Sequence, residues 1–238
     1  MTSTRREIST KALYTDTLQS TLGNDVVNLY VGQTRTQFTV HKDLICNVPW
    51  FKKAFLGGFK EQNGTMDMPE DSPEVVSLFV DWLYRGIVMR LNTLSHIKSL
   101  YGFYIFADKI REVELMDQII DAIQDLHDTH HLLPPPRVFS HVFHHTDRTS
   151  KLRKWVLGLY IFGLKGLNQY RTAAIEKFRH AAIKDQSLFT DIFDMISKGD
   201  VQWRGGPYGR CTFHGHSPKE RCYLLEKAPA ISSYYRDV

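Results

Sequence analysis

Two cysteines and two histidines lie close together near the C-terminal end of the sequence. They form the pattern Cys211-x-x-His214-x-His216, followed by Cys222, so four side chains with sulfur or imidazole ligand atoms fall within twelve residues. Zinc prefers four thiolate or imidazole ligands in a tetrahedron, and an irregular segment with little core of its own gains much stability from such an ion. The pattern is compatible with one closed structural zinc site. The alternative is that these side chains are exposed or partly packed and bind no metal.

A second candidate for metal binding is formed by histidines beside a proline-rich stretch. Two groups have helical spacing: His127, His130 and His131, and His141, His144 and His145. Histidines are common on protein surfaces near such boundaries, and at pH 7 most of them are neutral. We therefore expect a modest pH-dependent surface charge here, with metal binding as the weaker alternative.

Motifs of catalysis are missing from the sequence. It contains no glycine-rich phosphate loop, no Gly-x-Ser-x-Gly, no His-Glu-x-x-His and no dense carboxylate pair suited to acid–base chemistry. We therefore expect a binding protein and not an enzyme.

Composition and charge limit the classes of protein to which the chain can belong. The 238 residues are 42% hydrophobic and 24% charged, which is typical of a soluble globular protein. No apolar run approaches the roughly 20 residues of a membrane span, the first residues do not resemble a secretory signal, and three cysteines do not indicate a disulfide framework. These features predict a cytoplasmic or nuclear protein without a membrane partner. Residues 147–184 are strongly basic, but no DNA-binding pattern accompanies them, so we do not expect a nucleic-acid partner.

The elements that must position these side chains begin with strands. Residues 26–31 form a β-branched and aromatic run that ends at Gly32, and Phe38 and Val40 alternate with polar neighbours, which together predict a hairpin. Residues 65–68 also alternate and predict a third short strand. The clearest helix is predicted over 72–85, because Ser72 can cap it, a proline suits its first turn and a glycine follows its end. Helices are also predicted near 49–56, 138–144, 150–164, 168–183 and 187–198.

Five stretches in the first half of the chain, taken in order, resemble the BTB/POZ domain: 25–31, 38–42, 49–55, 58–61 and 78–86. The later helices and the Cys-x-x-His-x-His tail are similar to those of fungal-type BTB proteins. The resemblance implies an α+β fold, with a small mixed sheet flanked by helices, then a mainly α-helical region and an irregular tail. We predict a BTB/POZ domain over 20–126, a helical region over 137–199 and a tail with a zinc knuckle over 200–238.

The resemblance also implies a protein–protein interaction scaffold that forms a homodimer. The expected interface or groove residues are Leu13, Leu18, Leu22, Asp25, His41 and Lys42. Adaptor members of the family contact a cullin through a hydrophobic-x-Glu motif, and Phe59-Lys60-Glu61 stands at the matching place, so a substrate adaptor of a cullin-type ubiquitin ligase is the alternative. A transcriptional regulator is a further alternative. The substrate or regulatory protein that would be bound cannot be named from the sequence.

Overall fold

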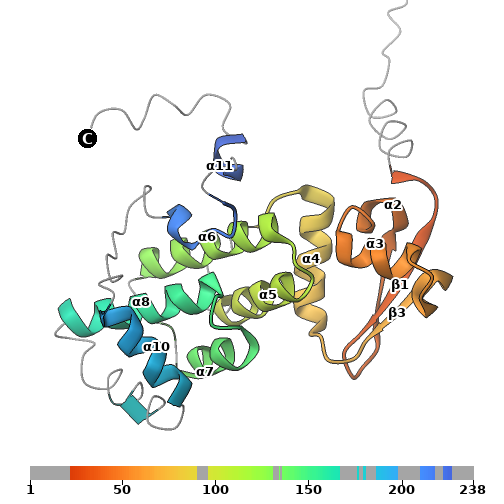
Figure 1. Cartoon of the computed structure of the whole chain (residues 1–238). Coiled ribbons are helices and arrows are strands. Elements are labelled where there is room, and N and C mark those ends of the chain that lie inside the picture. Colours follow the sequence, from red (N-terminus) through yellow and green to blue (C-terminus); the bar gives the residue numbers. More distant parts are fainter. Residues whose placement is uncertain are drawn as a thin grey trace, which may run out of the picture. The chain divides into compact units, whose positions relative to one another are not determined.

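The computed structural model describes residues 22–89, 96–130, 134, 136–166, 176, 179–180, 186–197, 210–217 and 222–226. The chain divides into two compact units, Met1–Gly86 and Ile87–Val238. Both α-helices and β-strands are present, and most of the described elements are helical (Figure 1). The stretch 127–137, where we expected a domain boundary, lies inside the second unit.

A small mixed sheet forms the centre of the first unit. Its middle strand β1, Val26–Val31, pairs antiparallel with β2, Thr36–His41, and parallel with β3, Thr65–Met68. Alternate side chains of β1 point into the core, so Val27 and Leu29 are fully buried. Gly32 turns the chain from β1 toward β2 with a left-handed φ of +70°, a conformation that suits glycine. The predicted hairpin and the predicted third strand are both confirmed.

Short helices connect these strands and pack against them. They are α2, Lys42–Ile45, α3, Pro49–Leu56, the 3-10 helix η1, Lys60–Asn63, and α4, Pro73–Arg85. The predicted ends of α4 are confirmed: Ser72 is the extended N-cap residue, Pro73 is the first helical residue, and Gly86 ends the helix with a left-handed φ of +69°. Ser72 makes no side-chain hydrogen bond to the start of the helix, so the proline and the glycine mark the ends of this element and the predicted side-chain cap is absent.

Aromatic side chains of α3 and α4 fill the core of the first unit. Phe51, Phe55 and Phe79 are fully buried, and the ring centroids of Phe51 and Phe79 lie 5.4 Å apart in a stacked arrangement. Burial of a large side chain of this kind stabilises the fold by about 1.5–3 kcal/mol. The conformation of the first unit is therefore fixed by one apolar core.

Helices make up the described part of the second unit. They are α5, Ile97–Lys109, α6, Val113–His130, α7, Pro136–His145, α8, Lys151–Gly166, α10, Gln186–Ser197, the 3-10 helix η3, Arg210–Phe213, and α11, Tyr223–Glu226. The helices predicted over 138–144, 150–164 and 187–198 are confirmed with small shifts of their ends. The helix predicted over 168–183 lies almost wholly outside the described residues.

The core of the second unit is built where α5, α6 and α8 meet. Tyr101 and Trp155 are fully buried, and their ring centroids lie 6.5 Å apart. The buried face of α6 also carries polar residues, among them Asp117 and Asp121, which are 3% and 5% exposed. Buried carboxylates require partners, and these two contact the segment after η3, as described below.

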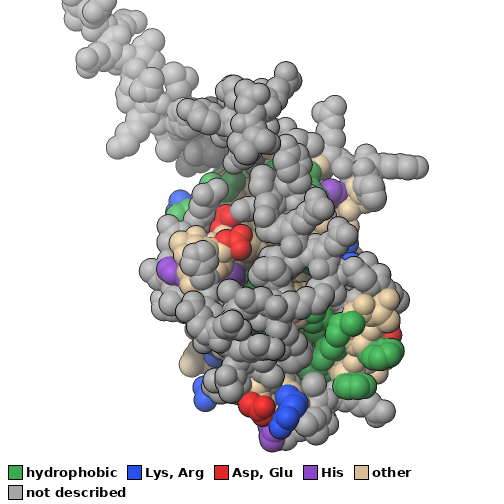
Figure 2. Space-filling model, turned by 90° about the vertical axis from the view of Figure 1, so that its left-hand side faces the viewer, with side chains coloured by type: hydrophobic (Ala, Val, Ile, Leu, Met, Phe, Trp, Pro, Cys, Tyr) green, Lys and Arg blue, Asp and Glu red, His purple; other side chains and the backbone are tan. Residues whose placement is uncertain are grey.

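The surface of the described residues combines polar and apolar side chains. Figure 2 shows hydrophobic side chains that gather on the surface of the molecule. Phe189, Phe193 and Ile196, which follow one face of α10, are 54–65% exposed. Within the described residues, no helix combines the length and apolar character that crossing a bilayer requires.

Candidate metal centre

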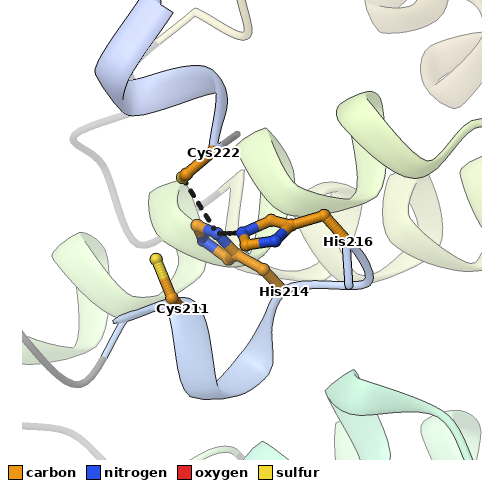
Figure 3. A group of neighbouring side chains, drawn as sticks. All are labelled: Cys211, His214, His216 and Cys222. Atoms are coloured by element: carbon orange, nitrogen blue, oxygen red, sulfur yellow. Dashed lines mark hydrogen bonds between the residues drawn. The ribbon is translucent and has the colours of Figure 1, made fainter. Parts of the chain in front are cut away.

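Two short segments bring the four predicted ligands together. Cys211 lies in η3, His214 and His216 follow this helix directly, and Cys222 immediately precedes α11. Figure 3 shows that their side chains converge beside α6. The four ligand atoms all lie within 4.8 Å of one another, so the cluster could hold a metal ion.

Two distances within the cluster match the edges of a zinc tetrahedron. The Nδ1 atom of His214 lies 3.3 Å from Nε2 of His216 and 3.5 Å from Sγ of Cys222. Zn–N bonds of about 2.05 Å and Zn–S bonds of about 2.3 Å give N–N and S–N edges of about 3.3 and 3.6 Å in a tetrahedron. Both pairs of ligand atoms that include His214 therefore already have the spacing of a bound site. Cys211 is the exposed member of the cluster and can move more freely than the other three.

The hydrogen bonds of the two histidines decide which nitrogen atoms are available to a metal. Nε2 of His214 lies 3.1 Å from a carboxylate oxygen of Asp121, and Nδ1 of His216 lies 3.0 Å from the carbonyl oxygen of Ser217. Both partners are acceptors, so these nitrogen atoms carry the hydrogen and donate it. A neutral imidazole has one N–H, so the two nitrogen atoms that face each other at 3.3 Å both present lone pairs. A metal ion or a proton between them removes this repulsion, so the donor set is compatible with a metal ion.

Two of the four candidate ligands are shielded from water. His214 and Cys222 are 1% and 5% exposed. Burial raises the pKa of the Cys222 thiol to about 11, so this thiol keeps its proton at neutral pH in the absence of a nearby cation. A divalent cation reverses this preference because it stabilises the thiolate as a ligand. Metal binding would therefore release a proton from Cys222.

The sequence reasoning missed two carboxylates of α6 that support the cluster. Asp121 accepts the hydrogen bond from His214, and Asp117, one helical turn earlier, accepts the backbone N–H of Gly215 at 2.6 Å. Burial raises the pKa of Asp117, and the bond from Gly215 partly offsets this effect. The available signal was two aspartates four residues apart among apolar residues of one helix, which indicates a buried polar partner.

The predicted histidine site is corrected in part. His127 is 3% exposed, and its Nε2 atom lies 2.9 Å from the hydroxyl of Tyr101, so it is a buried core residue and not a surface charge. His144 and His145 are exposed, and each Nδ1 atom contacts the carbonyl of the residue one turn earlier. Within the described residues, the cluster of Cys211 is the one group with the composition and spacing of a metal site. His131 lies outside the described residues.

The predicted interface residues lie partly within the described structure. Leu13 and Leu18 are outside it, and Leu22 is half-buried. Asp25 and Lys42 meet at the end of the hairpin, where the backbone N–H of Lys42 donates to the carbonyl of Asp25 at 2.8 Å.

His41 is the last residue of β2 and contacts α4. Its Nδ1 atom lies 2.7 Å from the hydroxyl of Tyr84. This contact and the hairpin bond between Asp25 and Lys42 are links within the first unit.

The residues of the predicted cullin motif differ in exposure. Phe59 lies between α3 and η1 and is 53% exposed, so its ring is not part of the core. Glu61 lies in η1, and its side chain is 18% exposed. One apolar ring of this motif is therefore available to a partner.

The whole sequence matches no model of a known protein family, and a search of curated proteins also finds no match.

Proposed function

We propose that the protein is an interaction scaffold of the BTB/POZ type that associates with itself through its first unit. The main support is the sheet order β2-β1-β3, in which a hairpin is followed by a strand parallel to β1. This is a small mixed sheet flanked by helices, as the resemblance implies. The helix α4, whose last turn contains Trp82-Leu83-Tyr84, adds to this support.

Exposed apolar side chains on the first unit are consistent with docking. Val26, Leu56, Phe59 and Tyr84 are 43–53% exposed. Apolar surface of this kind gains free energy when a partner removes it from water. Catalysis has no comparable support among the described residues.

Light scattering coupled to size exclusion tests self-association. The chain is expected to elute with the mass of a dimer, and the double variant Leu18→Asp, Leu22→Asp is expected to elute as a monomer. Phe189→Asp is the control, because it adds a charge at an exposed apolar position of the second unit, which is not proposed to form the interface. A wild-type chain that stays monomeric up to high micromolar concentration would exclude this function.

We further propose that the metal is one structural zinc ion. Two sulfur and two imidazole ligands favour zinc, and protein side chains would occupy all four positions, which is the composition of a closed structural site. The ion would link η3 to the start of α11 and hold both segments on α6. When bound, the ion would cross-link these segments and would have no open coordination position for a substrate.

Metal analysis by mass spectrometry tests the zinc proposal. One zinc per chain is expected for the wild type and for Cys46→Ser, which removes the cysteine that lies in the other unit. The double variant Cys211→Ser, Cys222→Ser is expected to lose the metal. Equal metal content in all three proteins, or a zinc-free wild type purified without chelator, contradicts the proposal.

A cullin adaptor is the second candidate function, and the exposure of Phe59 favours it. A ring that is 53% exposed directly after α3 is available to insert into an apolar pocket of a partner. In a pull-down with a purified cullin, Phe59→Ala is expected to weaken retention at least tenfold. Phe189→Ala, which removes a ring that is 60% exposed on α10, is the matched control. Retention that is equal for both variants, or absent for the wild type, rejects the adaptor function.

A further inference from the structure

The carboxylate of Asp121 lies at the centre of a hydrogen-bond network around the metal ligands. One of its oxygen atoms accepts from Nε2 of His214 at 3.1 Å, and the other accepts from the hydroxyl of Tyr223. The side chains of His214 and Asp121 are 0% and 7% exposed. Water therefore competes little for this contact, and a buried hydrogen bond of this kind holds its groups in one orientation.

The same carboxylate connects both halves of the ligand set. His214 belongs to the segment after η3, whereas Tyr223 directly follows the ligand Cys222. A movement of Asp121 would therefore disturb an imidazole ligand and the chain next to a sulfur ligand together. The residue lies 93 positions from His214 in the sequence, so no local backbone geometry fixes this contact.

The contact also determines the tautomer of His214. Because the carboxylate oxygen is an acceptor, it holds the hydrogen on Nε2 and leaves the lone pair on Nδ1, which faces the other ligands. The negative charge also raises the basicity of the imidazole and strengthens its bond to a metal. In the other tautomer, Nδ1 would carry a hydrogen and could not bind.

We propose that Asp121 is the positioning residue of the metal centre and that Tyr223 holds it in place. This inference rests on the zinc site proposed above. Asp117 assists from one turn earlier, because it anchors the loop between the two histidine ligands through the N–H of Gly215. Helix α6 then holds the segment that carries His214 and His216 in place.

The substitution Asp121→Asn tests the proposal, because it keeps the shape of the side chain and removes its charge. Zinc affinity of the full chain is measured by competition with a chromophoric chelator. The variant is expected to bind zinc about 10–100-fold more weakly, the usual loss when such a partner is mutated. Asp128→Asn, at an exposed position of the same helix, is the matched control and is expected to bind as the wild type does.

Two further measurements separate positioning from a general effect on folding. Thermal unfolding in excess chelator is expected to show a folded Asp121→Asn chain with a transition like that of the wild type. Long-range 1H–15N spectra of the zinc-loaded wild type are expected to show His214 bound through Nδ1 with its hydrogen on Nε2, and His216 bound through Nε2. The spectra need no variant, so they test the inference even if the substitution prevents folding.

The outcomes distinguish this inference from the zinc proposal. If the wild-type chain binds no zinc, both the zinc proposal and the positioning role of Asp121 are wrong. Zinc binding by the wild type together with an unchanged affinity of Asp121→Asn, or a His214 that is bound through Nε2, overturns the positioning role and leaves the zinc site standing.

Discussion

Replacement of Gly215 by alanine would place a methyl group where the ligand loop approaches α6. A Cβ atom built on Gly215 lies 3.0 Å from Cγ1 of Val113 and 3.6 Å from Oδ1 of Asp117. Carbon atoms prefer a separation of about 3.5–4.0 Å, so the loop or the valine must move by about 0.5 Å. This movement would also lengthen the 2.6 Å hydrogen bond between the N–H of Gly215 and Asp117.

The free-energy cost of this clash depends on how easily Val113, the side chain that the new methyl group meets, can move. Overpacking in a well-packed region costs about 1–3 kcal/mol. Gly215 is exposed and Val113 is 44% exposed, so both can yield in part, which places the cost at the lower end, about 1 kcal/mol. Because Gly215 lies between two candidate ligands, we expect this cost to appear as a weaker affinity for zinc, by about fivefold.

Removal of the clashing methyl group should restore binding. Zinc affinities of Gly215→Ala, Val113→Ala and the double variant are compared with that of the wild type by chelator competition. Val113→Ala alone is expected to be close to neutral, since the side chain is half exposed, and the double variant is expected to recover most of the lost affinity. If Gly215→Ala binds as the wild type does, or if the double variant is no better than the single one, the described approach of the loop to α6 is wrong.

Three more predictions concern pH and buried polar groups. The raised pKa of Cys222, about 11, means that zinc displaces a proton from this thiol below that pH, so proton release from this thiol alone should lower zinc affinity about tenfold for each pH unit between 8 and 7; a pH-independent affinity contradicts this. Tyr101→Phe removes the hydroxyl partner of a buried histidine and should cost about 1–3 kcal/mol in urea unfolding, and an unchanged midpoint would show that the bond contributes nothing. Asp191 contacts the buried Arg153, whose side chain is 7% exposed, at 2.7 Å and the exposed Arg148, whose side chain is 56% exposed, at 2.6 Å. Asp191→Ala should therefore lower the free energy of unfolding by about 3 kcal/mol, and Arg148→Ala should lower it by less than about 1 kcal/mol. Equal losses in the two variants would refute this ranking.

Some elements were predictable because their signals lie within a few residues of one another. Pro73 and Gly86 mark the two ends of α4 through their allowed backbone angles, and the structure places those ends where the sequence predicts them. The strand alternation and the four metal-ligand candidates were equally visible, since the ligands lie within twelve residues. The proposed BTB/POZ relationship and the proposed partners stay predictions, because they concern surfaces and proteins beyond this chain.

Other features depend on contacts between residues that are distant in the sequence. Nothing near Thr65–Met68 specifies that this strand lies parallel to β1, because its partner residues lie 37 positions earlier in the sequence. The surface position predicted for His127 was wrong because α5 and α8 cover it.

The metal centre combines both kinds of information. Residue type and spacing identify Cys211 and its three neighbours as candidate ligands, because ligand chemistry is a property of the side chains themselves. The support from Asp117 and Asp121 arises only when α6 packs against the segment after η3, since about a hundred residues separate the partners and burial alone gives their hydrogen bonds strength.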